Sequence, residues 1–310
     1  MRNPGIHEEQ PEFVDVVGYD EDRQPDSQYR DALEIIYDKG KEVWPIHGEM
    51  AKRYIGPQLR YKMSNGFPVI NERSLSKTFN SALAEHIAFL NGARTQEQLE
   101  SFGCNWWDRW VTAEKCAIFG LEPGDLGDGS YGAAWTNFPT SEGPPFDQIE
   151  NVVRQIKERP ELRTHMITPW IPQYDIQHSG LQRKVVVAPC HGWIHVLTDP
   201  KEKTLSVHHW QRSADFPVGV PFNMIQYAAF GLMMAKDLGY TFDELIYTYS
   251  DAHIYEPQFE AVETLLNREP RALGKVAITS EPKNIKDYRP NDFMLTDYNP
   301  HKGMRIDTPV

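Results

Sequence analysis

The chain carries three ordered segments that decide its interpretation: Val185-Val186-Val187-Ala188-Pro189-Cys190-His191, then Gln211-Arg212-Ser213-Ala214-Asp215, then Gly219-Val220-Pro221-Phe222-Asn223. The first two segments are predicted to be adjacent strands, and the third is predicted to open a helix. This arrangement would bring a thiol, a guanidinium, a carboxylate and a carboxamide to one pocket. A thiol attacks as its thiolate, which a nearby cation stabilises. The three segments therefore predict a catalytic site built around Cys190.

Composition restricts the class of protein. The chain has 310 residues, of which 40% are hydrophobic and 12% aromatic, enough to bury a full core. No apolar run reaches the length of a membrane span, and the N-terminus lacks the apolar core of a signal peptide, so we expect a cytoplasmic protein. The net charge of −12 argues against broad binding to nucleic acid. Three cysteines without paired spacing fit neither a disulfide framework nor a metal site, so no metal is expected.

Periodicity predicts a single α+β domain with a mixed or antiparallel sheet covered by helices. Residues 1–27 are acidic and contain several prolines, so we expect a flexible N-terminal arm followed by a catalytic domain over residues 28–310. The segment 104–138 is expected to be irregular. Helices are expected over residues 29–40, 74–90, 95–103, 146–158, 223–238 and 256–267. Strands are expected near residues 54–70, on both sides of a turn at residues 64–66, and near 163–170, 183–189, 191–198, 204–211, 245–255 and 275–279.

The three segments resemble the core motif of the thymidylate synthase family. The resembling runs are Pro189-Cys190-His191, Gln211-Arg212-Ser213-x-Asp215 and Gly219-x-Pro221-Phe222-Asn223-Met224-x-x-Tyr227-Ala228. The similarity continues in Glu85, Trp107-Asp108-x-Trp110, Tyr131-Gly132-x-x-Trp135 and Asp251-Ala252-His253-Ile254-Tyr255. It runs from about residue 28 to the end of the chain, and several separate motifs in the right order make it specific.

The resemblance implies a thymidylate-synthase-like fold and a homodimer, and the composition leads us to expect that it binds no nucleic acid and no membrane. It also implies transfer of a one-carbon unit from 5,10-methylenetetrahydrofolate to C5 of a pyrimidine nucleoside monophosphate. C5 of a pyrimidine is a poor nucleophile until another group adds at C6. The thiolate of Cys190 would make that addition, and C5 would then accept the one-carbon unit.

The resemblance further assigns roles to individual residues. Asn223 would orient the base, Glu85 would organise proton transfer near the C4 substituent, and Tyr131 and His191 would assist proton removal from C5. The other implied substrate contacts are Gln211, Arg212, Ser213, His253, Tyr255 and, across a dimer interface, Arg163. The implied folate contacts are Trp107, Asp215, Gly219, Phe222 and Val310. Of these, Asp215 would hold the pterin ring and count among the catalytic residues as well.

Three positions depart from the family pattern. An arginine expected in the phosphate loop is missing from Trp44-Pro45-Ile46-His47-Gly48, and Arg163 is followed by Thr164 where a second arginine is usual. Arg53 or Lys52 could replace the lost cations. Trp106 stands where a smaller apolar residue is usual beside the folate ring. These changes favour 5-hydroxymethylation of the nucleotide over reductive methylation to a thymidylate, which stays open as the alternative.

The motifs leave the base and the sugar of the nucleotide open. The base is uracil or cytosine, since Asn223 resembles the uridylate-type residue, and the sugar is ribose or deoxyribose. A catalytically silent homologue that binds nucleotide or RNA is a further hypothesis. A papain-like hydrolase is disfavoured because Cys190 and His191, as neighbours in a strand, would point apart. For the same reason His208 and His209 are expected to be structural and not a metal pair.

Overall fold

The computed structural model describes residues 16–46, 48–281 and 283–309. Its centre is a seven-stranded sheet in the order β2-β3-β8-β7-β6-β5, with β4 also pairing with β8. The strands are β2 (Lys41–Val43), β3 (Ala51–Ile55), β4 (Gln58–Lys62), β5 (Met166–Ile167), β6 (Trp193–Asp199), β7 (Thr204–Asp215) and β8 (Thr241–Tyr255). Only β7 and β8 pair in parallel within this described sheet, so the predicted mixed sheet is confirmed.

Two short strand pairs and nine α-helices complete the described part of the fold. The pairs are β1 (Pro25–Asp26) with β9 (Arg271–Ala272), and β10 (Lys275–Ile278) with β11 (Phe293–Thr296). The helices are α1 (Gln28–Lys39), α2 (Phe79–Leu90), α3 (Gln96–Phe102), α4 (Ala113–Ile118), α5 (Tyr131–Thr136), α6 (Gln148–Glu158), α7 (Pro172–Asp175), α8 (Gly219–Leu238) and α9 (Phe259–Leu266). Short 3₁₀ turns lie at Met63–Asn65, Glu256–Gln258, Ile285–Asp287 and Pro290–Asp292.

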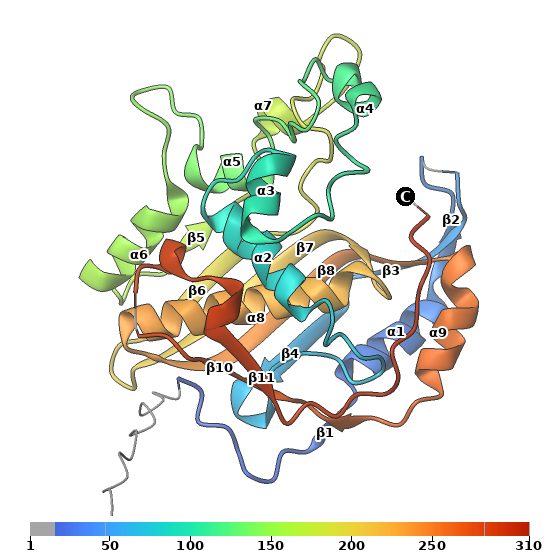
Figure 1. Ribbon diagram of the computed structural model, residues 1–310, viewed down its shortest axis with the longest axis vertical. Coiled ribbons are helices and arrows are strands. Elements are labelled where there is room, and N and C mark those ends of the chain that lie inside the picture. Colours follow the sequence, from blue (N-terminus) through green and yellow to red (C-terminus); the bar gives the residue numbers. More distant parts are fainter. Residues whose placement is uncertain (1–15, 47, 282, 310) are drawn as a thin grey trace, which may run out of the picture.

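Helix α8 forms the centre of the hydrophobic core. It lies across β7 and β8, and α2 packs against its other side (Figure 1). Nearly every residue of α8 is buried, as its continuous apolar sequence predicts. A Cβ at Gly231 would lie 2.2 Å from the ring of Phe242, so the absence of a side chain there lets the helix approach β8 closely.

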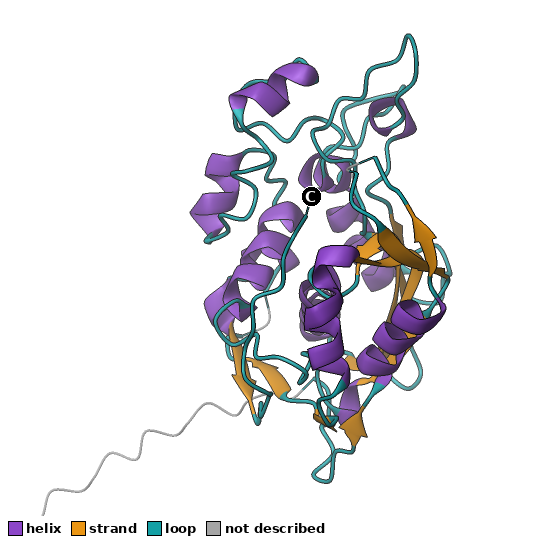
Figure 2. Cartoon of the chain, turned by 90° about the vertical axis from the view of Figure 1, so that its right-hand side faces the viewer, coloured by secondary structure: helices purple, strands orange, loops and turns teal. Residues whose placement is uncertain are grey.

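The sheet has two different faces. Along β7 the buried residues alternate with half-buried ones, and the buried His209 and Gln211 face α8. The half-buried His208 and Trp210 therefore lie on the opposite face, where Trp210 packs edge-on against Trp193 of β6. Figure 2 shows the sheet from the side, with most of the helices gathered on one side of it. Within the described residues, no helix is both long and apolar enough to cross a membrane.

The segment before α1 differs in part from the expected flexible arm. Val16 and Val17 are buried, and the backbone N–H of Phe242 donates to the carbonyl of Val16. Residues 25–26 pair with β9, which explains why the chain is held there although its composition is polar. Residues 16–27 therefore pack on the domain, while residues 1–15 lie outside the described part of the chain.

Five other expectations about secondary structure need correction. The segment 104–138, expected to be irregular, contains the helices α4 and α5. Residues 183–189 form no strand, because Pro189 and the positive φ of Gly192 interrupt the ladder before β6. The expected strand at 163–170 is reduced to β5. The expected helix at 74–90 begins only at Phe79. The two strands expected around residues 64–66 lie instead on either side of Gly56-Pro57, as β3 and β4.

Candidate active site

Cys190 lies in a loop that runs alongside β7. The backbone N–H groups of Arg212 and Ser213 both donate to the carbonyl oxygen of Cys190, at 2.9 and 3.4 Å. Arg212 also reaches across to the loop, because its Nε donates to the carbonyl of Pro189 and its Nη2 to that of Ala188. The first two segments therefore lie side by side, as predicted, although the segment that carries Cys190 is a loop and not a strand.

The environment of the thiol combines burial with positive charge. Nη2 of Arg212 lies 3.6 Å from Sγ of Cys190, and the hydroxyl of Tyr131 accepts from the Cys190 backbone N–H at 2.7 Å. Burial raises the pKa of the Cys190 thiol, while the charges of Arg212 and Arg183 and a hydrogen bond from Tyr131 lower it. The cations favour the thiolate form that a nucleophile needs.

His191 points away from the thiol and into the core. Its Nδ1 lies 2.5 Å from the hydroxyl of Tyr227, and its ring stacks on Tyr131 with centroids 4.4 Å apart. Burial lowers the pKa of His191 to about 3, so the ring is neutral at physiological pH. Cys190 and His191 therefore do not form a nucleophile–base pair. This agrees with the expectation, but the reason differs, because the two residues lie in a loop and not in a strand. This arrangement disfavours a papain-like hydrolase.

His209 also has a structural environment, as expected. Its Nε2 accepts from the backbone N–H of Gly192 at 2.8 Å, and its ring stacks on Tyr227 with centroids 3.6 Å apart. His208 points to the other face of the sheet and contacts the hydroxyl of Thr248. No group of three or more metal-ligating side chains comes together among the described residues.

Glu85 and Asn223 are joined through a residue that the sequence did not identify. Gln226 donates from Nε2 to Oε2 of Glu85 at 2.6 Å and accepts from Nδ2 of Asn223 at 3.0 Å. The indole Nε1 of Trp107 donates to the other Glu85 oxygen at 2.7 Å. Burial raises the pKa of Glu85, and the hydrogen bonds from Gln226 and Trp107 oppose that shift. A carboxylate with a raised pKa is suited to acid–base work near neutral pH.

The C-terminal ends of β7 and β8 bring Asp215, His253 and Tyr255 together. Asp215 pairs with His253 in the parallel register, and the rings of His253 and Tyr255 lie 5.0 Å apart. Nε2 of Gln258 donates to both Asp215 oxygens and to the carbonyl of Asp307 in the C-terminal tail. Burial raises the pKa of Asp215, and the His253 charge lowers it. Val310 lies outside the described residues.

An aromatic wall stands beside the first turn of α8. The rings of Trp106 and Phe222 lie 5.0 Å apart at an angle of 51°, and the Arg73 guanidinium lies 5.6 Å from the Phe222 ring. Gly219 opens the helix, and Asp215 accepts from the backbone N–H of Val218 just before it. A half-buried acceptor beside ring faces suits a flat molecule that carries N–H donors.

The structure separates the candidate phosphate cations. Lys52 donates to the carbonyl of Tyr37 and packs over that ring, so its ammonium group is engaged beside α1. Arg53 lies opposite His253 in the β3–β8 pairing and 3.8 Å from Asp251. Arg163 is exposed. The loop expected to bind phosphate is open to solvent, with Trp44 70% and Ile46 96% exposed, and His47 lies outside the described residues.

Sequence reasoning missed two polar residues of this site. Arg183 approaches closely enough for its charge to lower the pKa of Cys190, and its Nη2 donates to the carbonyl of Val186. Gln226 is buried within the apolar helix α8. An amide inside an otherwise apolar buried helix is the signal that could have identified it, since such a group needs partners.

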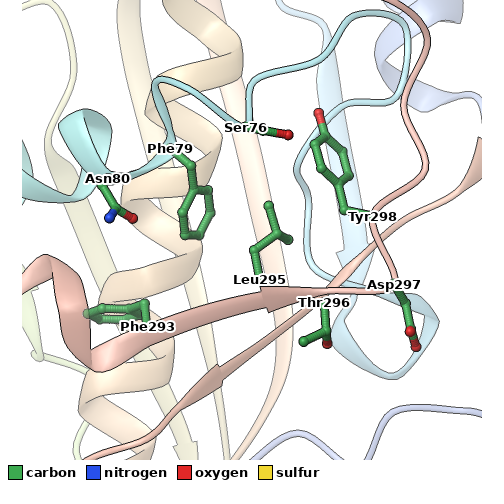
Figure 3. A pocket seen from close by; sticks show the side chains of 8 residues that line it. All are labelled: Ser76, Phe79, Asn80, Phe293, Leu295, Thr296, Asp297 and Tyr298. Atoms are coloured by element: carbon green, nitrogen blue, oxygen red, sulfur yellow. The ribbon is translucent and has the colours of Figure 1, made fainter.

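A separate hollow of about 390 Å³ lies between the start of α2 and β11 (Figure 3). Its lining residues are Ser76, Phe79, Asn80, Phe293, Leu295, Thr296, Asp297 and Tyr298. None of them is a predicted site residue. The only charged lining residue, Asp297, pairs with Lys275 at 3.1 Å, so the hollow holds no unpaired charge for chemistry. We therefore assign the chemistry to the surroundings of Cys190.

Comparison with protein families agrees with the resemblance seen in the sequence motifs. The family described as thymidylate synthase matches residues 27–310, which include every element from α1 to the C-terminus. The match thus covers Cys190, the Arg212 strand and the Asn223 helix together.

Proposed function

Because the chain belongs to the thymidylate synthase family, we propose that it hydroxymethylates C5 of a pyrimidine nucleoside monophosphate with methylenetetrahydrofolate as the one-carbon donor. Members of this family carry out folate-dependent one-carbon transfer to C5 of pyrimidine nucleotides. The observation that supports a working enzyme is the Cys190 sulfur 3.6 Å from the Arg212 guanidinium. A silent homologue would not require this pairing of nucleophile and cation.

Cys190 and its neighbours supply the covalent step. The sulfur of Cys190 bonds to C6 of the ring, and the C5–C6 electron pair becomes available at C5 for the one-carbon unit. The C5 proton then leaves through solvent ordered by the Tyr131 hydroxyl, while His191 stays neutral behind it. Loss of this proton releases tetrahydrofolate from the one-carbon unit and leaves an exocyclic methylene on C5. Water that adds to this methylene returns an electron pair to the ring, which breaks the C6–S bond and frees the thiolate.

Asn223 and Glu85 act on the other side of the ring. The Asn223 carboxamide binds the C4/N3 edge and stabilises the negative charge that develops there when sulfur adds to C6. Glu85 exchanges protons with solvent near the C4 substituent, a role that its raised pKa supports.

The sugar and the phosphate bind at the C-terminal ends of β7 and β8. His253 and Tyr255 hold the sugar hydroxyl, with Gln211 and Ser213 on the neighbouring strand. Arg212 and Ser213 hold the phosphate, and Arg183 and Arg53 replace the arginines that the sequence lacks. Charged hydrogen bonds of this kind contribute about 1.5–3 kcal/mol each.

Arg163 of the partner subunit completes the phosphate site in a homodimer. The sheet face opposite α8 supports this assembly, because the half-buried Trp193 and Trp210 lie there beside His208. Aromatic residues of this kind are enriched at interfaces between subunits.

The folate binds against Trp107, Phe222 and Gly219, and Asp215 accepts hydrogen bonds from the pterin N–H groups. When bound it supplies a one-carbon unit at the oxidation level of formaldehyde. Trp106 packs on Phe222, so a large indole stands where the family usually has a smaller apolar side chain. An altered seat for the pterin favours attack of water on the exocyclic carbon over hydride transfer, so we favour the hydroxymethyl product.

A product assay tests this function. Purified protein is incubated with methylenetetrahydrofolate and UMP, dUMP, CMP or dCMP, and the nucleotide is weighed by mass spectrometry. Hydroxymethylation adds CH₂O and releases tetrahydrofolate, whereas reductive methylation adds CH₂ and releases dihydrofolate. Activity that persists in Cys190→Ala, or no product from any nucleotide, would contradict the proposal.

A further inference from the structure

An unbroken row of hydrogen-bonded side chains crosses the base-binding side of the candidate site. In this row Trp107 donates to Glu85, Gln226 donates to Glu85, Asn223 donates to Gln226, Gln211 donates to Asn223, and Tyr247 donates to Gln211. Gln226 is 1% exposed and stands at the middle of it. An amide at this depth must satisfy both its oxygen and its nitrogen within the protein.

Backbone carbonyls fix the direction of both glutamines. Nε2 of Gln226 donates to the carbonyl of Ala82 at 3.2 Å as well as to Glu85. Nε2 of Gln211 donates to the carbonyl of Ser213 at 2.8 Å. A carbonyl can only accept, so turning either amide over would set oxygen against oxygen and leave a buried donor unpaired.

These two glutamines leave Asn223 one favourable orientation. On the Glu85 side it meets the Gln226 oxygen at 3.0 Å, which needs the Asn223 nitrogen there. On the other side it meets the Gln211 nitrogen at 3.3 Å, which needs the Asn223 oxygen there. The Asn223 carboxamide still has one N–H and one oxygen lone pair for a ligand. The donor lies toward Glu85, and the acceptor lies toward Gln211.

We propose that Gln226 is a positioning residue that holds the Asn223 carboxamide in this orientation and thereby makes the site prefer uracil over cytosine nucleotides. The proposal rests on the function proposed above, which sets C6 against Cys190 and the sugar against His253. With those two ends fixed, the C4 side of the ring faces Glu85.

The two bases differ at the edge that Asn223 meets. Uracil presents a carbonyl oxygen at C4 and an N–H at N3, which match a donor on the Glu85 side and an acceptor on the Gln211 side. Cytosine presents an amino group at C4 and a lone pair at N3, so donor would meet donor and acceptor would meet acceptor. A site built for one hydrogen-bond pattern rejects the inverted pattern strongly, because buried polar groups are left unpaired.

Gln226→Met tests the proposal, since it keeps the length of the side chain and removes both polar atoms. Asn223 is then held only by its longer contact to Gln211 and can turn over. We expect wild-type protein to favour uracil over cytosine nucleotides about 100-fold or more in kcat/KM. In Gln226→Met this ratio should fall to about ten-fold or less, because kcat/KM for cytosine nucleotides rises relative to that for uracil nucleotides.

Two further variants separate positioning from general damage. Tyr61→Phe removes the hydrogen bond from the Tyr61 hydroxyl to the sulfur of Met224, beside Asn223 on α8, and should leave the base ratio unchanged. Gln226→Glu, protonated beside the Glu85 carboxylate, keeps an oxygen toward Asn223 and an O–H donor toward Glu85, and it should keep the uracil preference even where its rate falls. This variant also gives a readout if Gln226→Met does not fold.

The outcomes distinguish the two proposals. Turnover of uracil and cytosine nucleotides at similar rates by the wild type, or an unchanged ratio in Gln226→Met, would overturn the role of Gln226 and leave the proposed function standing. Wild-type preference for cytosine would do the same. Failure to convert any pyrimidine monophosphate would overturn both.

Discussion

The guanidinium of Arg212 lies 3.6 Å from the sulfur of Cys190, while two of its nitrogens donate to the carbonyls of Ala188 and Pro189. One side chain thus shapes the loop that carries the nucleophile and also places a positive charge beside it. Burial acts in the opposite direction on the thiol. The reactivity of Cys190 therefore depends on Arg212 more than on His191, its neighbour in sequence.

Replacing Arg212 with leucine should raise the pKa of the Cys190 thiol, because burial remains and the largest opposing charge is removed. The rate of alkylation of Cys190 by iodoacetamide should then reach its midpoint at a higher pH than in the wild type. Peptide mass spectrometry separates Cys190 from the buried Cys104 and Cys116. Arg212→Lys keeps the charge and should shift the midpoint less. Equal midpoints for all three proteins would contradict the assigned electrostatics.

Glu85→Gln should lower kcat by about 100- to 10,000-fold, the range for loss of a general acid or base. The glutamine amide at position 85 would also place its NH₂ group against the N–H donor of Trp107 or of Gln226, so one hydrogen bond is lost. Burial raises the pKa of Glu85, so wild-type activity that needs its carboxylate should fall as pH drops through a value above the usual carboxyl range. That acidic limb should be absent in the variant. The exposed Glu97→Gln is the control, and a normal kcat in Glu85→Gln would refute its role.

Mixing two inactive variants tests the shared site. Arg163→Ala and Cys190→Ala should each be inactive or nearly so as pure proteins. After subunit exchange, half of the dimers are mixed and each holds one intact site, so activity should recover to about a quarter of wild type. Native mass spectrometry, which resolves the mixed dimer from the two homodimers by mass, monitors the exchange. An exchanged mixture that stays inactive would show that Arg163 does not act across the interface.

His86→Leu should stabilise the fold most at acidic pH. Neither ring nitrogen of His86 has a hydrogen-bond partner among the described residues, and burial lowers its pKa to about 3. The unfolded chain takes up a proton below about pH 6.5 that the folded chain does not bind, so wild-type stability is lost as pH falls. Relative to wild type, the unfolding free energy of the variant should gain about 2 kcal/mol between pH 7 and pH 5.

Urea unfolding at both pH values measures this difference. Ile87→Leu, a substitution in the same helix without a titratable group, should differ from wild type equally at the two pH values. An identical offset for His86→Leu at pH 7 and pH 5 would show that His86 is not held neutral.

The sequence predicted correctly that certain residues lie close together, but it predicted less well the secondary structure of the segments that contain them. The continuous apolar run after Asn223 has one stable solution, a buried helix, and α8 is that helix. The run 185–187 is equally apolar but short, and a buried loop has the same pattern as a buried strand. The order of motifs therefore located Cys190 beside Arg212, while the local geometry of Cys190 depended on carbonyl contacts that no sequence pattern encodes.

The polar row through Gln226 shows another limit. A single glutamine in an apolar helix carries no motif, and its partner Glu85 is distant in the chain, although Asn223 lies one helical turn before it. Only the packing of α2 against α8 brings the three together. Lys52 and Arg53 illustrate the same limit, since neighbours in a strand face opposite sides and the sequence did not decide which one faces the site.

A covalent complex tests the central claim most directly. The protein is incubated with methylenetetrahydrofolate and the 5-fluoro derivatives of uridine and cytidine monophosphates, in ribo and deoxy forms, and the denatured chain is weighed and digested. Because fluorine cannot leave C5 as a proton does, the bond between sulfur and C6 should persist. We predict an adduct of nucleotide and folate on the Cys190 peptide, absent from Cys190→Ser. An unmodified Cys190 with every one of these nucleotides would contradict the account.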